Sequence, residues 1–277
     1  MLQEIAPRHL NNHYEPRAIG PGARVCCFRD REVLIDRRAD GLHLPKWEQL
    51  RAGILRSVYL FSVDDAPYFL AQLRPDFAPP EGLCYEELRP HRYLGPRHTV
   101  YAEMTAWHLY VWYRDNQFCG RCGHPTVHDD RERMMRCPSC GNMIFPKICP
   151  AIIVGVTDGE RILLTRYSGR VTKHYALVAG FTEIGETAEE TVAREVYEET
   201  GLRVKNIRYY NTQPWGIDSD LLLGYFADLD GAPEITIDKN ELSMAGWYHR
   251  DEIEPPADSA SLTSDMIRAF VENRHPR

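Results

Sequence analysis

The segment from Gly180 to Leu202 constrains the fold of this 277-residue chain more than any other stretch. Thr187, followed three positions later by Glu190, forms a capping box, which predicts a helix that starts near Ala188. Gly201 is expected to end that helix, because glycine readily adopts the left-handed conformation that follows many helix C-termini. The predicted helix also carries an apolar stripe that can pack on a sheet, formed by Ala188, Val192 and Val196.

Three carboxylates crowd onto one side of the same predicted helix. Glu195, Glu198 and Glu199 lie at i, i+3 and i+4, where like charges destabilise a helix by roughly a few tenths of a kcal/mol per pair. Arg194 is expected to offset part of this charge as an ion-pairing brace. A set of hard oxygen ligands is also what Mg²⁺ or Mn²⁺ prefers, particularly when substrate phosphates complete the coordination. A solvated acidic helix face is the alternative interpretation, and the chemistry favours the metal site.

Two Cys-x-x-Cys pairs predict a second, independent metal site. Cys119 and Cys122 are separated from Cys137 and Cys140 by fourteen residues, a spacing typical of two zinc knuckles that close one tetrahedral site. Four thiolates leave no open position for water or substrate, so this Zn²⁺ site is expected to be structural.

Each zinc knuckle is expected to be a tight turn, with backbone freedom from Gly120 and Gly123 and stiffness from Pro138. Zinc ribbons also serve as docking modules for nucleic acid or protein, and Arg131, Arg133 and Arg136 give this one some positive charge. Free cysteines are the remaining alternative. The other cysteines are predicted to be small buried apolar residues, namely Cys26, Cys27, Cys84 and Cys149.

The rest of the chain is rich in predicted strands with a few helices, which indicates an α+β fold class. Short apolar runs separated by Pro, Gly and Asp predict N-terminal strands at 25–28, 33–35, 58–61 and 68–70. Apolar residues spaced for a helix follow at 99–114. Asp158-Gly159 is expected to form the two-residue turn of a hairpin. Later apolar runs predict strands at 152–157, 161–165, 206–211, 221–227 and 246–248, and a helix at 262–272.

Charge and hydropathy argue against some classes of protein. The net charge of −7 and the pI near 5.9 argue against a dedicated nucleic-acid binder, which needs a basic surface. The N-terminus lacks a basic segment followed by an apolar stretch, and the most apolar run, 151–156, is far shorter than the ~20 residues that a bilayer requires. The chain is therefore predicted to be cytoplasmic and to have no membrane partner.

The stretch from Gly180 to Leu202 resembles the Nudix box, G-x5-E-x7-R-E-U-x-E-E-x-G-U, in which U is a bulky aliphatic residue. The resemblance implies an α/β/α sandwich that cleaves a nucleoside diphosphate linked to another moiety, with Glu195, Glu198 and Glu199 as catalytic metal ligands. Divalent ions at such ligands neutralise pyrophosphate oxygens and lower the pKa of a bound water. Glu198 or Glu199 could also accept the proton of that water, and the sequence leaves both open.

The order of its parts makes the chain similar to the NADH pyrophosphatase branch of the Nudix superfamily. A four-cysteine ribbon precedes the box, a further N-terminal region precedes the ribbon, and Gln213-Pro214-Trp215 follows the box. The resemblance implies an N-terminal domain over 1–115 that ends in a helix, a zinc ribbon over 116–147 and a Nudix domain over 148–277. The later signature of this branch, S-Q-P-W-P-F-P-x-S, corresponds to 212–220, where Gly216-Ile217-Asp218 replaces Pro-Phe-Pro.

The resemblance also implies which residues bind the substrate. Trp215 offers a flat face on which a nicotinamide ring or another base can stack, with a packed core tryptophan as the alternative. Loss of the Phe and both prolines makes the following loop more flexible and reduces selectivity for the nicotinamide half. The implied contacts in this stretch are Gln213, Pro214, Trp215, Gly216, Ile217, Asp218, Ser219 and Asp220.

Five further positions match the branch. Phe145 and Phe181 resemble aromatic residues that sandwich the adenine, one from each of two subunits, which implies a homodimer; the alternative is that both are core residues. The carbonyl of Ala179 and the carboxylate of Glu241 match the remaining Mg²⁺ or Mn²⁺ ligand positions. Thr263 matches a backbone contact to the substrate.

Three functions are compatible with these features. The leading one is hydrolysis of NADH or NAD⁺ to nicotinamide mononucleotide and AMP, including removal of NAD caps from RNA. The second is a broader Nudix hydrolase of ADP-ribose, FAD or dinucleoside polyphosphates, which the replaced Pro-Phe-Pro segment favours. The third, from another class, is a zinc-ribbon RNA-binding or nucleotide-sensing protein without catalysis. The complete set of three helix carboxylates argues against this last function.

Overall fold

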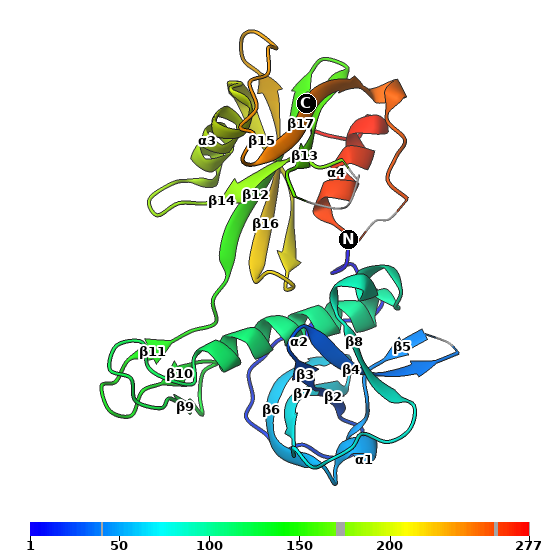
Figure 1. The fold of residues 1–277 in the computed structure, drawn as a ribbon, viewed down its shortest axis with the longest axis vertical. Coiled ribbons are helices and arrows are strands. Elements are labelled where there is room, and N and C mark those ends of the chain that lie inside the picture. Colours follow the sequence, from blue (N-terminus) through cyan, green and yellow to red (C-terminus); the bar gives the residue numbers. More distant parts are fainter. Residues whose placement is uncertain (40, 170–174, 258–259, 277) are drawn as a thin grey trace. The chain divides into compact units, whose positions relative to one another are not determined.

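A computed structural model describes residues 1–39, 41–169, 175–257 and 260–276 (Figure 1). The chain divides into two compact units. The first consists of Met1, Ile148–Trp215 and Asp220–Arg277, and the second of Leu2–Lys147 with Gly216–Ser219. The four-cysteine segment therefore belongs to the same unit as the N-terminal region, as does one short turn from the C-terminal half. The three-part division into 1–115, 116–147 and 148–277 stays a prediction.

The first unit is built on a six-stranded mixed sheet. β12 and β16 run parallel, and the other pairs are antiparallel. All five strands predicted in this region are confirmed, each somewhat longer than expected. The strand order is β15 (Val204–Trp215), β16 (Asp220–Leu229), β12 (Cys149–Asp158), β13 (Arg161–Tyr167) and β17 (Leu242–His249), with β14 (Val178–Phe181) beside β12.

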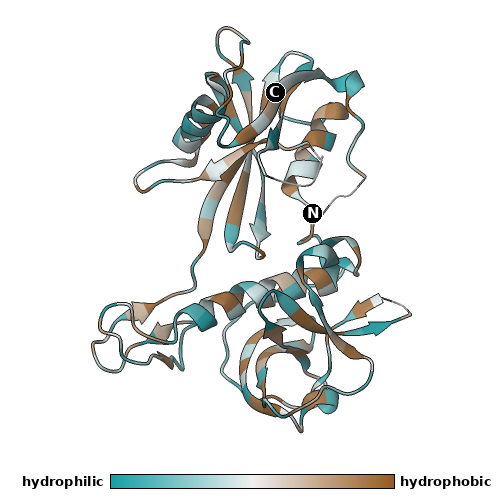
Figure 2. Cartoon of the chain, in the orientation of Figure 1, coloured by the Kyte–Doolittle hydropathy of each residue, from teal (hydrophilic) through white to brown (hydrophobic). Residues whose placement is uncertain are grey.

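Helices cover both faces of this sheet. Side chains alternate between the two faces of a strand, and the even-numbered residues from Ile152 to Val156 pack with Val192 and Val196 of α3 (Ala188–Thr200). Ile153, which points the other way, packs with Met266 of α4 (Leu262–Val271). Figure 2 shows α3 as a mainly hydrophilic ribbon, as expected for a helix that buries one stripe. The α/β/α sandwich is therefore confirmed.

Both ends of α3 form as the local signals predict. The Thr187 hydroxyl accepts a hydrogen bond from the Glu190 backbone N–H at 3.2 Å, and the Glu190 carboxylate accepts one from the Thr187 N–H at 2.8 Å. Gly201 has a φ of 70° and donates its N–H to the Tyr197 carbonyl at 2.8 Å. The helix therefore starts and ends where the capping residues require.

The β12–β13 hairpin forms, but its turn lies one position later than predicted. Asp158 pairs with Arg161 across the ladder, so the loop residues are Gly159 and Glu160. Asp158 and Arg161 also form an ion pair. Gly159 therefore takes the first loop position, where its φ is 61°.

The second unit contains two four-stranded sheets, a small three-stranded sheet and a long helix, so its predicted strand-rich character is confirmed. One sheet has the order β1 (Leu10–Asn11), β6 (Ile54–Val63), β7 (Ala66–Leu73) and β2 (Arg24–Cys26). The other has the order β3 (Phe28–Arg29), β4 (Glu32–Arg38) and β5 (Gly41–His43), with β8 (Leu83–Glu87) beside β4. The ribbon strands are β9 (Val127–His128), β10 (Met135–Arg136) and β11 (Met143–Ile144).

Helix α2 (Arg97–Asp115) confirms the helix predicted at 99–114 and organises the core of the second unit. Its residues Trp107 and Trp112 are buried in one cluster with Phe61 of β6. The short helices α1 (Trp47–Leu50) and η1 (Arg89–Tyr93) belong to the same unit, and η2 (Arg250–Glu252) belongs to the first. Of the helices within the described ranges, none combines the length and apolarity needed to span a bilayer.

The four cysteines outside the ribbon differ in burial. Cys26 and Cys27 are buried as predicted, and Cys149 is half-buried. The prediction is wrong for Cys84, which is exposed. Cys84 lies on β8, an edge strand of its sheet, and its Sγ lies 3.4 Å from the Glu86 carboxylate.

Candidate active site

The four predicted zinc ligands converge in the ribbon. The Sγ atoms of Cys119, Cys122, Cys137 and Cys140 all lie within 4.8 Å of one another. The Cys119–Cys140 and Cys122–Cys137 sulfur pairs are 3.6 and 3.5 Å apart, close to the roughly 3.8 Å edge of a tetrahedron with Zn–S bonds of about 2.3 Å. The backbone N–H of Cys140 lowers the pKa of the Cys137 thiol, which favours the thiolate that zinc binds. The donor set therefore fits one structural zinc ion.

The two knuckles share one backbone geometry. The N–H groups of Gly123 and Gly141 donate to the carbonyls of Cys119 and Cys137 at 2.8 and 3.0 Å. Both glycines are left-handed, with φ of 75° and 72°. The prediction that Gly120 supplies this freedom is wrong, because the left-handed position follows the second cysteine of each pair, and Gly141 fills it in the second knuckle.

The ribbon arginines are partly engaged in folding. Arg133 Nη2 donates to the Asn12 carbonyl at 3.3 Å and also to the Leu60 carbonyl of β6. Arg136 Nη2 donates to the Asp129 carboxylate at 2.5 Å. These contacts reduce the positive charge that the ribbon can offer to a nucleic acid, which weakens the docking-module interpretation.

Glycine at the start of the Nudix-like segment is explained by a close approach of helix and strand. Gly180 lies on β14, and a Cβ atom there would fall 2.0 Å from the Glu195 Cδ atom of α3. The requirement is for space, because Gly180 is not among the residues with a positive φ. Any side chain at this position would displace the Glu195 carboxylate.

Arg194 donates hydrogen bonds to several carboxylates of the cluster. Its guanidinium donates to both carboxylate oxygens of Glu186, at 2.6 and 2.8 Å, and to the Phe181 carbonyl at 3.0 Å. It also donates to Glu195 Oε1 at 2.8 Å and to Glu198 Oε2 at 3.0 Å. The hydrogen bonds from Arg194 lower the pKa of Glu186 to about 2. The structure thus gives Glu186 a role that the sequence did not indicate, as the main partner of the arginine.

Glu199 is the most buried member of the cluster. Its side chain is 4% exposed, and its Oε2 atom has no hydrogen-bond partner among the described residues. Burial, together with the negative charges of Glu195, Glu241 and Asp238, raises its pKa to about 8. Burial also raises the pKa of Glu195, although Arg194 opposes that shift. A buried carboxylate among like charges favours a bound cation, so these residues fit a divalent metal ion.

The two remaining predicted metal ligands are the carboxylate of Glu241 and the carbonyl of Ala179. Glu241 directly precedes β17, and its negative charge acts on both Glu195 and Glu199. Ala179 lies on β14 next to Gly180, and its carbonyl accepts a hydrogen bond from the Tyr167 hydroxyl at 3.5 Å.

Asp238 is a further acidic residue at the site that the sequence did not single out. Its N–H donates to the Glu199 carbonyl at 3.0 Å, and its carboxylate accepts from the Asn240 N–H at 2.8 Å. The Asp-x-Asn spacing is typical of a turn in which an aspartate caps its own backbone. That turn signal could have identified Asp238.

The carboxylates do not close into a ligand set in this structure. Among the described residues, the four cysteines form the only group of metal-binding side chains whose ligand atoms lie within 4.8 Å of one another. Glu195 and Glu198 are turned toward Arg194. Each of these contacts uses one carboxylate oxygen, Oε1 of Glu195 and Oε2 of Glu198.

Phe145 and Phe181 are both exposed. The exposed fractions are 52% for Phe145 and 57% for Phe181, so the alternative that they are core residues is wrong. Phe145 belongs to the second unit and Phe181 to the first. Their pairing across two subunits stays a prediction.

Gln213 is used to hold α4 in place. Its buried side-chain amide donates to the Ala260 carbonyl at 2.9 Å and accepts from the Leu262 N–H at 2.7 Å. Thr263 lies in the first turn of the same helix and is half-buried. Both ends of the Gln213 amide thus contact the protein itself.

Other members of the predicted substrate stretch differ in exposure. Trp215 is 9% exposed and Asp220 is also buried, whereas Pro214 is exposed. In this structure Trp215 is therefore packed, as in the alternative interpretation. The turn between them, Gly216–Ser219, belongs to the second unit.

Two sequence families match the chain. Residues 148–270 match the family described as NUDIX domain, and residues 114–145 match the family described as NADH pyrophosphatase zinc ribbon domain. Together these matches include the four cysteines and the whole of α3.

Several bacterial proteins are similar in sequence. A Mannheimia succiniciproducens protein named NAD-capped RNA hydrolase NudC is 34% identical over 242 residues, which cover 85% of this chain and 84% of that protein. A Citrobacter koseri protein of the same name is 42% identical over 145 residues, but the match spans only 56% of its length and 52% of this chain. A solved NUDIX hydrolase from Nitrosomonas europaea is 20% identical, with a TM-score of 0.48, over 57% of this chain and 92% of its own.

Proposed function

The chain belongs to the Nudix hydrolases that carry an NADH pyrophosphatase zinc ribbon, and on that premise we propose that it hydrolyses the pyrophosphate bond of NADH or NAD⁺. The products are nicotinamide mononucleotide and AMP. Because the relatives are named for NAD-capped RNA, the proposed substrates include NAD caps on RNA. The proposed setting is the cytoplasm.

The observation that carries the proposal is the acidic cluster around the buried Glu199 of α3. Glu195, Glu198, Glu199 and Glu241, with the carbonyl of Ala179, would hold Mg²⁺ or Mn²⁺. A divalent ion there supplies charge neutralisation for the pyrophosphate and lowers the pKa of a water molecule. The raised pKa of Glu199, about 8, and its unpartnered oxygen support this assignment.

The protein's own groups have separate tasks in the proposed reaction. Arg194 holds Glu195 and Glu198 in place before the substrate arrives. Glu199 or Glu198 accepts the proton of the attacking water. Gly180 keeps the space that the Glu195 carboxylate occupies.

Phe145 and Phe181 are the proposed adenine contacts. Both rings are exposed and can stack on a base. The proposed assembly is a homodimer in which each adenine meets one of these residues from each subunit. The exposure of two large apolar side chains supports a surface that is covered by substrate or partner.

A second candidate function is broader hydrolysis of ADP-ribose, FAD or dinucleoside polyphosphates. The packing of Trp215 favours it, because a buried indole offers little of its face to a nicotinamide ring. The replaced segment Gly216-Ile217-Asp218 also favours broader hydrolysis, because it contains no aromatic residue that could contact a nicotinamide ring.

A substrate panel distinguishes the two candidates. Purified protein with Mg²⁺ or Mn²⁺ is offered NADH, NAD⁺, ADP-ribose, FAD, a dinucleoside polyphosphate and NAD-capped RNA, and products are separated by chromatography. A kcat/KM at least tenfold higher for NADH, NAD⁺ or capped RNA than for the others supports the first candidate. Equal values support the second, and failure of every substrate to yield a nucleoside monophosphate contradicts both.

A further inference from the structure

The replaced segment Gly216-Ile217-Asp218 makes three consecutive contacts with the helices of the second unit. A Cβ atom on Gly216 would lie 2.3 Å from the carbonyl oxygen of Met104 on α2, so only glycine fits. The Ile217 carbonyl accepts a hydrogen bond from Trp107 Nε1 at 3.1 Å. The Asp218 carboxylate accepts from Arg89 Nη2 at 2.8 and 3.2 Å.

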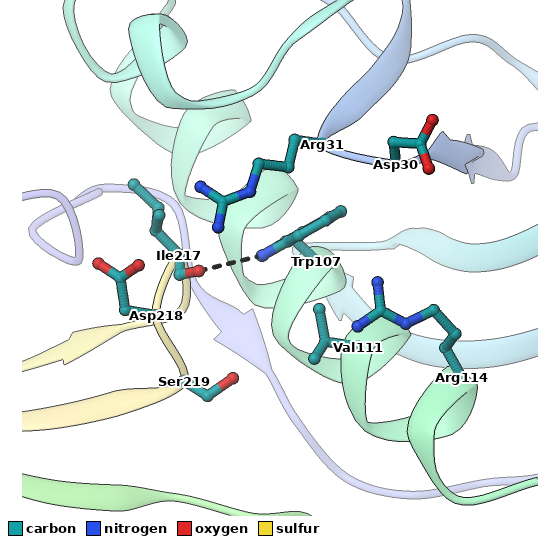
Figure 3. Close-up of a pocket in the computed structure, with 8 residues that line it drawn as sticks. All are labelled: Asp30, Arg31, Trp107, Val111, Arg114, Ile217, Asp218 and Ser219. Carbon is teal, nitrogen blue, oxygen red and sulfur yellow. Dashed lines mark hydrogen bonds between the residues drawn. The ribbon is translucent and has the colours of Figure 1, made fainter.

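Trp107, Ile217 and Asp218 also line an open hollow of about 440 Å³ (Figure 3). In Figure 3 the Trp107 indole N–H points to the Ile217 carbonyl, while the Arg31 and Arg114 side chains extend along the same surface. Trp107 itself is packed, with its ring 5.4 Å from those of both Phe28 and Tyr110. This packing therefore holds the indole N–H in one orientation, toward the turn.

A buried interaction holds the short helix that carries Arg89. Arg89 begins η1, and in the same short helix His91 Nδ1 lies 3.0 Å from the Glu103 carboxylate of α2. Both of these side chains are buried. The pair ties η1 to α2, so Arg89 and Trp107 extend from one packed framework.

The two ends of the turn are fixed as well. Trp215 and Asp220 pair directly across β15 and β16, and both are buried. Ser219 takes a left-handed conformation with a φ of 67°, which a residue other than glycine adopts only when its surroundings require it. The fixed ends and the contacts of Gly216, Ile217 and Asp218 together restrict the conformation of this turn.

We infer that Gly216, Ile217 and Asp218 form a clip that replaces the stiffness of Pro-Phe-Pro, and that Arg89 and Trp107 are positioning residues for the substrate-binding segment. Proline restricts a loop through its own ring, whereas the clip restricts it through contacts with α2 and η1. This inference rests on the proposed function only where it assigns substrate contacts to 213–220. The effect on catalysis is expected in KM, because positioning of a binding segment changes substrate affinity more than the chemical step.

Charge reversal tests the clip. Arg89→Asp and Asp218→Arg each break the ion pair, and the double variant R89D/D218R restores it with reversed polarity. Trp107→Phe removes the indole donor and keeps a ring. Each single change is expected to raise KM for NADH roughly twofold to fivefold with kcat nearly unchanged, since a half-exposed ion pair contributes little free energy. The double variant is expected to recover most of the loss.

The matched control is the ion pair of Arg8 with Asp64, which lies in the same unit at 3.0 Å. Its side chains are 50% and 41% exposed, compared with 42% and 43% for Arg89 and Asp218. Arg8→Asp is expected to leave KM unchanged. An equal rise in KM in this control would overturn the assignment of Arg89.

Amide hydrogen exchange of a peptide that spans 212–221 tests the clip without reference to activity. Exchange is expected to accelerate in Asp218→Arg and Arg89→Asp and to slow again in the double variant. Unchanged exchange in both single variants would overturn the clip, and faster exchange without a change in KM would overturn the positioning role. If the wild-type protein does not hydrolyse NADH, the proposed function fails, and the exchange data decide the clip independently.

Discussion

Glu199 is subject to two opposing demands, because burial favours its neutral form whereas metal binding requires its charged form. Its pKa of about 8 in the fold lies above the ordinary value of 4.5. The neutral group therefore stabilises the metal-free protein fully below about pH 4.5, and this stabilisation is lost as the pH rises through about 8.

The free energy of unfolding of metal-free protein is accordingly expected to fall between about pH 5 and pH 8. Glu199→Gln removes the titrating group and should flatten this pH dependence. Urea unfolding of the wild type and of the variant, in the presence of a chelator, measures the difference. Parallel pH dependences would contradict the raised pKa.

The same substitution tests the role of Glu199 in the reaction. Glu199→Gln is expected to lower kcat by ~10² or more with a modest change in KM, because a metal ligand or base acts mainly in the transition state. Glu189→Gln on the same helix is a suitable control, since Glu189 is exposed and contacts Tyr225 at 3.3 Å. The two variants are compared by steady-state kinetics with NADH. If Glu199→Gln and Glu189→Gln both retained the wild-type kcat, Glu199 would lie outside the site.

At the scale of secondary structure, α3 shows why some elements can be predicted. Its capping box, its apolar stripe and its terminal glycine are all local signals, and each acts on neighbouring backbone. The hairpin turn was misplaced by one residue because the Asp-Gly dipeptide does not show whether the glycine takes the first or the second loop position, and Gly159 takes the first. Gly120 was misassigned because spacing alone does not show which glycine of a knuckle is left-handed.

The glycine that ends α3 provides a stability test. Gly201→Ala is expected to destabilise the protein by about 1 kcal/mol, because alanine strains the left-handed conformation and its Cβ would lie 3.3 Å from Thr236. Gly120→Ala is the matched control, since that glycine has open space and no positive φ. Thermal unfolding measures the stability of both variants. If Gly120→Ala were as destabilised as Gly201→Ala, the assignment of Gly201 as the end of α3 would be contradicted.

At the scale of the whole molecule, the ribbon is joined to the N-terminal sheet by contacts that sequence patterns do not encode. Arg133 reaches Asn12 and Leu60, and the Tyr14 hydroxyl donates to the Asp129 carbonyl at 2.8 Å. The docking of Gly216–Ser219 on α2 is a similar case. Such contacts join residues that are far apart in the chain and have no periodicity, so the sequence predicted the ribbon and the α/β/α sandwich but not these contacts.

Zinc removal tests this connection. Cys137→Ser is expected to destabilise the second unit, because structural zinc contributes folding free energy and the ribbon supports Tyr14 and Asn12. Amide hydrogen exchange should increase first in 116–147 and at the N-terminal segment around Tyr14. Protection that remains at wild-type levels near Tyr14 while the ribbon opens would show that the two are not coupled.

We propose that the acidic cluster around Glu199 hydrolyses a pyrophosphate bond with a divalent metal ion. The most direct measurement is the release of AMP from NADH by purified protein, with and without Mg²⁺ or Mn²⁺, beside Glu199→Gln. The wild type is expected to release AMP and reduced nicotinamide mononucleotide in equal amounts and only with the metal, and the variant at most about one hundredth of that rate. AMP release that is independent of metal, or equal in the variant, would contradict this proposal.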